Sequence, residues 1–414
     1  MNDYLLNKHK VMKHLFAAFI LCILPIKGVT QEIKNITGKI IDEETKQPIE
    51  SVTIYTSSNN TITNTDGEFE IKCMENEKIM FLHINYYPSE IQSQDSPSIL
   101  ELKPRTYDLA EIVILSTEGT VNELKGVWNK YDGLFKDKKQ NDFQQKSFYY
   151  RQLVFVDDAC SEYIESFFTA PVSVRITDLA LQEGRYAKIK KKSIPNFTNF
   201  FAMSQITPFS TAVGKANNPN PFLCADFEKY YEPKIHRVIS PGQEDEVKVY
   251  EFTPLQADAT KAPHQSGRLY IRSRDQAIVR MEVQLKGITG SPDKMAIIQE
   301  DNYHINMIYK ETNGMYPIVE SVQVNAGILS VHKFKKKNEV AINVKSTLVA
   351  VETTFDEQGN KLKQSDALLK KVAKSKYDQA FWDNHPVVKR TEIEQQVLDD
   401  FNRQGYFGTM QLEK

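Results

Sequence analysis

The sequence has few cysteines, and no two of them have the spacing that a metal or redox site needs. Its 414 residues contain four, of which Cys22 lies in an apolar segment near the N-terminus. The other three, Cys73, Cys160 and Cys224, are widely spaced and odd in number. Such a set is not a disulfide framework, and without a C-x-x-C pair it gives no zinc or thiol–disulfide motif. We expect at most one disulfide, and otherwise small buried thiols.

An excess of charge of one sign is also missing. Lys and Arg total 52 and Asp and Glu total 54, a net charge of −2. Bulk charge therefore gives no reason to expect a nucleic-acid partner or an acidic membrane. Apolar residues make up 41% and aromatic residues 10% of the chain, which is enough to build the cores of two or three domains and excludes a disordered chain.

Sequence motifs of catalytic machinery are absent. The chain has no G-x-S-x-G, no H-E-x-x-H, no phosphate-binding loop and no G-x-G-x-x-G. Adjacent acids occur at Asp157-Asp158, Asp245-Glu246 and Glu300-Asp301, but neighbouring strand residues point to opposite faces and cannot flank one bond. We therefore predict no catalytic residue, no metal site and no cofactor. A hydrolase of an unrecognised type stays as an alternative.

Hydrophobic runs are short, and the clearest one lies near the N-terminus. Residues 15–26, LFAAFILCILPI, follow three lysines, and no later segment approaches 18 consecutive apolar residues. A run of about 12 is too short for a spanning helix, which needs about 20, but is typical of a secretory signal. We interpret residues 1–30 as a cleaved signal peptide, with Met12 as an alternative start. A retained anchor helix and a lipoprotein signal are the other interpretations.

The export signal sets the expected location. Removing residues 1–30 removes four lysines and one aspartate, which leaves 48 basic and 53 acidic residues and a mildly acidic protein. No spanning segment then remains to hold it in a membrane. We expect an exported protein in the periplasm or associated with the outer membrane.

Short strands separated by turns follow the signal. Val52 and Ile54 alternate with polar residues in one strand, and Phe69 and Ile71 alternate with glutamates in another, so each strand buries one face. Turn residues separate the segments, for example N-T-D-G at 64–67. Seven such segments within about 80 residues predict a β-sandwich.

The order of residues in this region resembles the carboxypeptidase-like regulatory domain. The pattern is G-x-I-x-D at 38–42, then Thr45, then Pro48-Ile49 before the strand with Val52, then N-T-D-G-E-F at 64–69. The resemblance covers residues 34–115 and implies a transthyretin-like β-sandwich. It implies no peptidase activity, because this module accompanies carboxypeptidases without carrying their zinc or catalytic residues. In Gram-negative envelope proteins the module often precedes another element, such as a periplasmic domain.

A helix and a larger β-rich domain follow. Residues 118–138 carry Val121, Leu124, Trp128, Tyr131 and Phe135 at helical spacing, which predicts an amphipathic linker helix. Residues 143–414 favour one large curved antiparallel sheet, or a half-barrel, with C-terminal helices within 365–405, where Thr391 and Glu394 have capping-box spacing. The clearest hairpin, at 268–285, has Leu269, Ile271, Ala277, Val279, Met281 and Val283 on alternate positions. It looks like hairpins of periplasmic lipoprotein-carrier folds.

One segment is a candidate contact site. Residues 194–224 hold five phenylalanines among Pro, Asn and Ser, namely Phe197, Phe200, Phe201, Phe209 and Phe222. Long loops with aromatic clusters often contact ligands or partners, but the favoured interpretation is that these rings fold back to fill the concave sheet. Two basic runs, KIKKK at 188–192 and KFKKK at 333–337, favour edge or loop charges, with anionic lipid or polysaccharide as an alternative partner.

Together these features favour a non-enzymatic cell-envelope binding or interaction protein, with an envelope protein or an apolar or glycan ligand as its partner. The alternatives are a periplasmic lipid or lipoprotein carrier with an apolar cavity and the unrecognised hydrolase. A cavity of several hundred Å³ would favour the carrier, and convergent titratable groups in a cleft would favour the hydrolase.

The signal-peptide interpretation predicts a shortened mature protein. Intact-mass measurement and N-terminal sequencing of protein recovered from the envelope should place the new N-terminus near Thr30 or Gln31. Protein with an intact N-terminus recovered from the cytosol would contradict the interpretation.

Overall fold

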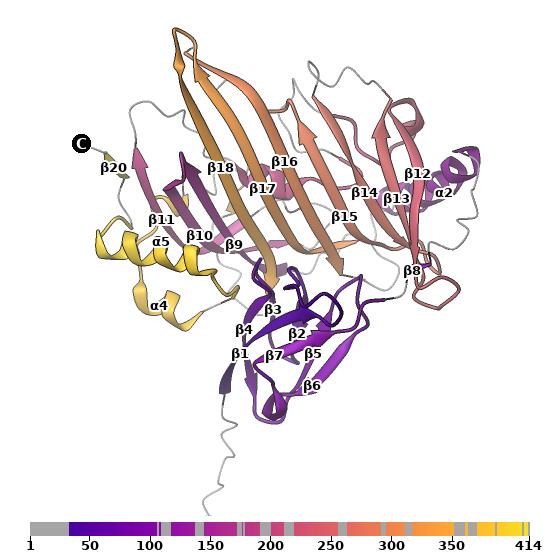
Figure 1. Ribbon diagram of the computed structural model, residues 1–414, viewed down its shortest axis with the longest axis horizontal. Coiled ribbons are helices and arrows are strands. Elements are labelled where there is room, and N and C mark those ends of the chain that lie inside the picture. Colours follow the sequence, from indigo (N-terminus) through magenta and orange to yellow (C-terminus); the bar gives the residue numbers. More distant parts are fainter. Residues whose placement is uncertain are drawn as a thin grey trace, which may run out of the picture.

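A computed structural model describes most of the chain after the signal segment. The described residues are 33–105, 107–108, 117–136, 145–171, 176, 179–190, 200–210, 219–255, 263–290, 295–310, 317–351, 361–362, 371–385, 387–407 and 410–412. They form an N-terminal β-sandwich and a large curved sheet that carries helices (Figure 1).

The sandwich consists of two small sheets that face each other. One has the order β4 (Glu68–Met74), β1 (Ile33–Asp42), β7 (Ile99–Leu102), and the other has the order β3 (Asn60–Ile62), β2 (Thr53–Tyr55), β5 (Lys78–Leu82), β6 (Ser89–Gln92). A short 3₁₀ helix, η1 (Ser93–Asp95), lies before β7. Phe69 and Phe81 meet edge to face in the core between the sheets, with ring centroids 5.7 Å apart.

The turn before β4 has the geometry that its residues predict. The Asn64 side-chain oxygen accepts hydrogen bonds from the backbone N–H groups of Asp66 (3.0 Å) and Glu68 (2.9 Å). Gly67 has φ +72°, and a Cβ at this position would lie 2.5 Å from the backbone oxygen of Ile40. Only glycine combines this conformation with so close a contact. The predicted turn at 64–67 and the predicted core position of Phe69 are confirmed, but the turn joins strands of the two sheets and does not close a hairpin.

The second body is built on one sheet with thirteen strands among the described residues. Its order is β19-β11-β10-β9-β18-β17-β16-β15-β14-β13-β12-β8, and β20 pairs in parallel with β11. The remaining neighbours are antiparallel. The strands are β8 (Tyr107–Asp108), β9 (Gln145–Val156), β10 (Ala159–Pro171), β11 (Leu179–Lys190), β12 (Tyr231–Ile239), β13 (Val247–Pro254), β14 (His264–Arg272), β15 (Ile278–Lys286), β16 (Ala296–Lys310), β17 (Ile318–His332), β18 (Lys335–Val351), β19 (Lys361–Leu362) and β20 (Met410–Leu412).

One face of this sheet, here called the core face, is covered by helix α2 (Thr117–Lys136) and by the segment with η3 (Phe200–Gln205) and η4 (Phe227–Lys229). Leu124, Val127 and Tyr131 of α2 are buried against the sheet. Gly126 and Gly133 lower the intrinsic helix propensity of α2, so this packing must stabilise it.

The opposite face, here called the outer face, carries the sandwich and the C-terminal helices α4 (Gln379–Asn384) and α5 (Glu392–Arg403) (Figure 1). Leu398 and Phe401 of α5 pack on Leu153 and Tyr163 of the sheet. The predicted capping box is confirmed, because Thr391 and Glu394 each bond the backbone N–H of the other. The expected fold class, a β-sandwich followed by a curved antiparallel sheet with helices near the C-terminus, is confirmed.

One hairpin differs from its predicted alternation. The register between β14 and β15 shifts so that Ile271 opposes Ile278, and Ile278 takes the buried place on the core face that we predicted for Val279. Val279 instead lies on the outer face, where it packs with Ile84 of the sandwich against Tyr270 and its neighbours. The physical reason is a β-bulge, which reverses the side-chain alternation beyond it.

Among the described residues, no helix is both long and apolar enough to cross a bilayer.

The packing on the core face predicts the effect of truncating an aromatic side chain. Phe201 is fully buried between Tyr150 and Phe168, so Phe201→Ala should lower the free energy of unfolding by about 3–5 kcal/mol in urea denaturation. Phe334→Ala is the matched control, because Phe334 is 72% exposed, and it should change stability by less than about 0.5 kcal/mol. Equal, small effects of both variants would contradict this docking of the segment.

Candidate ligand site between the sandwich and the sheet

The sandwich docks on the outer face at two places, and the first is centred on Arg105. The Arg105 Nε donates to the backbone oxygen of Tyr86 within the sandwich (2.9 Å), while Nη1 donates across the junction to Ser240 Oγ (2.8 Å) and to the Asp245 carboxylate. Arg237 Nη2 on β12 donates to Asn85 Oδ1 of the sandwich at 3.2 Å. Charged hydrogen bonds therefore hold this edge of the sandwich on the β12 end of the sheet.

The second place is centred on β3. Asn60 Nδ2 donates to Glu320 Oε1 (3.1 Å) and to the backbone oxygen of Ala350 (2.6 Å). Ser51 Oγ donates to Gln323 Oε1 on β17. Ile62 is fully buried in an apolar cluster with residues of the sheet and of the C-terminal segment, namely Tyr149, Phe167, Val349, Val351, Trp382 and Val388.

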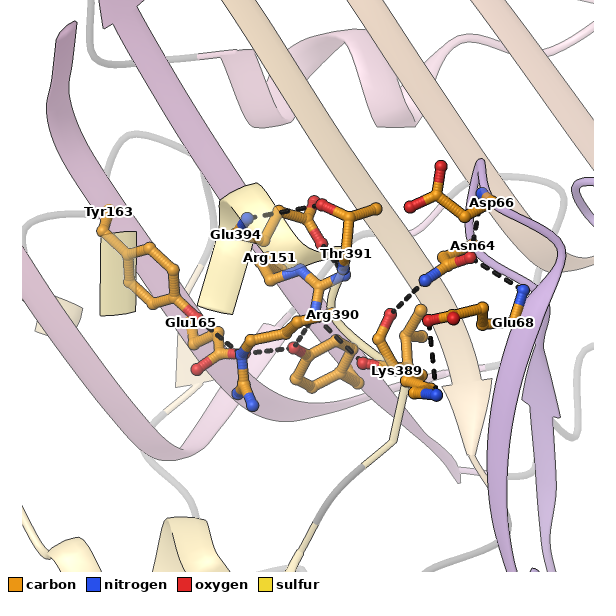
Figure 2. A network of polar contacts seen from close by, with 12 residues as sticks. Asn64, Asp66, Glu68, Arg151, Tyr163, Glu165, Lys389, Arg390, Thr391 and Glu394 are labelled. Atoms are coloured by element: carbon orange, nitrogen blue, oxygen red, sulfur yellow. Dashed lines mark hydrogen bonds and ion pairs between the residues drawn. The ribbon is translucent and has the colours of Figure 1, made fainter. Parts of the chain in front are cut away.

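The C-terminal segment 387–394 connects the two bodies through a polar network (Figure 2). On the sandwich side, Asn64 Nδ2 donates to the backbone oxygen of Lys389 (3.4 Å), and Lys389 Nζ lies 3.3 Å from Glu68 Oε2. On the sheet side, Arg390 Nη2 lies 2.8 Å from Glu165 Oε1, and its Nε donates to the Tyr163 hydroxyl at 3.2 Å.

The same network reaches α5. Arg151, whose side chain is 3% exposed, donates to the backbone oxygen of Val388 (3.0 Å) and pairs with Glu394 Oε2 (3.0 Å). Glu394 also closes the capping box with Thr391 (Figure 2). The start of α5 is thus fixed to the sheet and, through Lys389, to the sandwich.

Glu165 is the charged centre of this network. Its carboxylate is fully buried and accepts hydrogen bonds from Arg185 Nε (2.6 Å), Arg390 and the Tyr149 hydroxyl. Burial alone would raise the pKa of Glu165, but the guanidinium groups of Arg185, Arg390 and Arg151 hold that pKa well below its ordinary value. Glu165 is therefore a fixed anion, and its place under the C-terminal segment makes it a structural anchor.

A pocket of about 510 Å³ lies between the two docking places. The sandwich contributes one wall, with Met80, Leu82 and Ile84, and the outer face of the sheet contributes the other, with Val279 and Ile308. Small-molecule sites are typically apolar concavities of about 300–1,000 Å³ with a few polar groups, and this pocket fits that description.

Three cations and one acid line the same pocket. The cations are Arg105, Arg280 and Lys310, and the acid is Glu320. Arg280 pairs with Glu282 at 2.9 Å, and the Lys310 ammonium lies 5.2 Å from the centroid of the Tyr55 ring. The lining is therefore mainly apolar, and two of its cations are paired with acids outside it, Asp245 and Glu282.

A local irregularity in β17 places Glu320 in this wall. The register between β16 and β17 jumps from Ile308↔Ser321 to Tyr309↔Val319, so Glu320 has no residue opposite it. Such a bulge re-aims a side chain, and here it points the carboxylate at the sandwich. The Glu320 side chain is 1% exposed, with Asn60 on one oxygen and Lys146 Nζ at 4.0 Å from the other.

His83 lines the pocket as a neutral group. Its Nδ1 accepts a hydrogen bond from the backbone N–H of Asn85 at 3.2 Å, so the ring proton belongs on Nε2. Burial, together with Arg280 and Arg237 nearby, lowers the pKa of His83 to about 3. The imidazole is therefore neutral at any physiological pH.

A polar groove of about 840 Å³ lies beside the pocket on the outer face of β13 to β17. Arg280 lines both cavities. The groove presents histidine, amide and charged side chains, including His264, Arg268, Gln284 and Asn306.

The phenylalanines of segment 194–224 lie on the core face, away from this pocket. Phe200, Phe201 and Phe222 are buried, and Phe209 is half-buried against Trp128 and Tyr131 of α2. Phe197 lies outside the described residues. The four described rings thus fill the concave side of the sheet, and in this conformation none of the three buried rings is open to a partner.

The acid pairs do not assemble into a reactive centre in the structure. Asp157 and Asp158 form a turn. Asp245 binds Arg105. Asp301 is buried, and its carboxylate accepts the backbone N–H groups of Gly287 and Thr289.

Metal-binding and thiol chemistry have no assembled site in the described part of the chain. Cys73, Cys160 and Cys224 are free thiols. Burial raises the pKa of Cys160 to about 12, so its thiolate is not available as a nucleophile. Within the described ranges no three His, Cys, Asp or Glu side chains form a group that could hold a metal ion.

Comparison with known proteins identifies the N-terminal part. Residues 36–114 match the family model of the CarboxypepD_reg-like domain. The resemblance of the sandwich to this family is thereby confirmed, and among the strands of the large sheet the match includes only β8. A search of curated proteins gave no match.

Two solved structures show some similarity to the chain. One is a DUF1329 family protein from Desulfovibrio piger, with a TM-score of 0.20 and 9% identity, covering 56% of this chain and 93% of that one. The other is a LolA superfamily protein from Nitrosomonas europaea, with a TM-score of 0.17 and 12% identity, covering 57% and 96%. Similarity at this level carries no argument about ligands.

The residues of the pocket were not predicted from the sequence. His83, Arg280 and Glu320 belong to no motif, and they meet only because the sandwich docks on the sheet. One signal was present: the polar pair Glu320-Ser321 interrupts the alternation between Val319 and Val322, as a bulge does.

The lowered pKa of His83 predicts a pH-dependent stability. The unfolded chain binds a proton at its ordinary pKa of about 6.5, whereas the folded protein does so only near 3. This contribution to stability is therefore complete above pH 6.5 and is lost as the pH falls towards 3. Between pH 7 and 5.5, urea denaturation should show the wild type losing about 1 kcal/mol more than His83→Asn. Equal losses would contradict a buried neutral imidazole.

Proposed function

We propose that the protein is an exported, non-enzymatic binding protein of the cell envelope whose ligand occupies the pocket between the sandwich and the sheet. The observation that carries this proposal is the 510 Å³ pocket, whose apolar walls come from both bodies. When an apolar group replaces the water in a void of this size with apolar walls, the free energy of the system falls.

The lining selects the class of ligand. Met80, Leu82 and Ile308 favour an aliphatic or aromatic body. Asp245 and Glu282 already pair with Arg105 and Arg280, but Arg280 Nη1 is buried without a hydrogen-bond partner among the described residues, so the lining favours an anionic over a cationic head group. The ligand is therefore an amphipathic molecule with one apolar part and a carboxylate or phosphate.

The location of the site distinguishes this proposal from a lipid or lipoprotein carrier that holds its ligand in an apolar cavity enclosed by the curved sheet. The core face is filled by the protein's own aromatic rings, including Phe201 and Phe222. A ligand therefore binds on the outer face, where the regulatory-type sandwich forms half of the pocket. In an exported protein, lipids of the envelope and their breakdown products are available to bind at this site.

The proposal predicts binding of a fluorescent fatty acid. Titration with 11-(dansylamino)undecanoic acid should give a blue-shifted, saturable emission, which decanoate should displace more effectively than decanol. Met80→Glu places a charge in the apolar wall, where Met80 is 39% exposed and can be replaced without disturbing the core. This variant should weaken binding about ten-fold or more.

Ile99→Glu is the matched control, since Ile99 is a 52% exposed residue of β7 in the same sandwich and does not line the pocket. It should bind like the wild type. Equal loss in both variants, or no saturable binding by the wild type, would refute the site. Native mass spectrometry of protein purified from the envelope then identifies the natural occupant, and recovery of a protein partner without an amphipathic ligand would favour an adaptor instead.

A further inference from the structure

An exposed apolar patch lies at the end of the longest hairpin. The connected ends of β17 and β18 project beyond the neighbouring strands, at the end of the sheet that lies away from the sandwich (Figure 1). Phe334, in the turn between them, is 72% exposed. Met295 and Ile297, at the start of β16, are each 43% exposed.

All three residues lie at the same end of the β16–β17–β18 strands. The backbone N–H of Lys333 donates to the oxygen of Met295 at 2.7 Å, and Ile297 opposes Val331 in the β16–β17 ladder. The Phe334 ring lies against His332, with ring centroids 6.4 Å apart, and His332 opposes Ala296, so Phe334 and Ile297 lie on opposite faces of the same strand end. Met295, Ile297 and residues 332–338 are here called the hairpin tip.

The hairpin tip is strongly basic. Residues 332–338 read H-K-F-K-K-K-N, with four lysines and no acid. Lys333 is exposed beside Phe334, and the other three lysines occupy the start of β18. The whole chain has a net charge of −2, so this basic cluster is a local feature and not part of a general positive charge.

The combination of apolar and basic groups decides what can cover the tip. A water-soluble polyanion would pair with the lysines but would leave the phenyl ring of Phe334 in water. A second copy of the chain would bring lysines against lysines, which costs free energy. An anionic bilayer accommodates both groups, because lysines bind the phosphate head groups while an aromatic ring enters the boundary with the acyl chains.

We propose that the hairpin tip docks end-on on an anionic phospholipid surface, with Phe334, Met295 and Ile297 inserted between head groups and Lys333 on the phosphates. Pairing with neighbouring strands holds the hairpin that carries the tip in place. β16 and β18 flank β17 along most of its length, and Ile342 and Val344 of β18 pair with β9. The proposal does not depend on the ligand pocket, which lies at the other end of β17.

Vesicle sedimentation tests the docking. The full mature protein is mixed with vesicles of phosphatidylcholine alone or with about one third phosphatidylglycerol. It should sediment with the anionic vesicles only, and less so as the salt concentration rises. Phe334→Ser and Lys333→Glu should each lower the partition coefficient about ten-fold.

Two variants serve as matched controls. Ile393→Ser removes an apolar side chain that is 61% exposed on α5, and Lys103→Glu reverses an exposed charge on the sandwich. Both should bind like the wild type. Circular dichroism and urea denaturation check that all four variants fold.

Three results would overturn the proposal. The first is failure of the wild type to sediment with anionic vesicles. The second is unchanged binding by Phe334→Ser with loss only in Lys333→Glu, because a soluble polyanion would then satisfy the tip equally well. The third is a wild-type dimer that Phe334→Ser dissociates in light scattering, which would show a second copy covering the patch.

Discussion

The buried carboxylate of Glu165 is the interaction on which the arrangement of the two bodies depends. It neutralises Arg185 from the sheet and Arg390 from the C-terminal segment, and without it two guanidinium charges would lie next to each other with little solvation. Because Arg390 is held, its neighbour Lys389 is in place to contact Asn64 and Glu68 of the sandwich (Figure 2). A single anion in the sheet thus supports one attachment of a domain that it does not touch, beside the direct contacts made by Arg105 and Asn60.

The pocket is a property of the junction and of neither body alone. Two irregularities in the sheet shape its wall: one bulge turns Glu320 towards the sandwich, and a register shift in the β14–β15 hairpin turns Val279 to the same face. Regular strands would have placed both side chains differently. The sandwich then covers this surface with Met80, Leu82 and Ile84. The regulatory-type module here acts as one wall of a cavity, a role that its own sequence motif does not encode.

Local patterns predicted the parts of the fold that depend on local physics. The glycine turn at 64–67, the capping box at Thr391 and the aromatic and aliphatic residues of α2 follow from backbone conformation and short-range periodicity. The register shift beside Ile278 was not predictable, because the sequence alternates through it and only the paired strand shows the bulge. The pocket residues were missed for a similar reason, since His83 and Arg280 are 197 positions apart and meet only through docking. For the aromatic segment, the favoured interpretation agrees with the burial of Phe200, Phe201 and Phe222 in the core of the sheet.

The network at the junction also constrains the order in which the protein can reach its native state. Glu165 and Arg390 are 225 positions apart, and Asn64 and Lys389 are 325 apart. The sandwich has its own core and short-range pairings, and can form as soon as residues 33–105 are available. Its docking cannot be completed until residues 387–394 arrive, because until then the anion is short of a counter-charge and the sandwich lacks its last attachment. Contacts of such high sequence separation form slowly, so a chain that emerges N-terminus first passes through a state in which an already folded sandwich is tethered to an unfinished sheet.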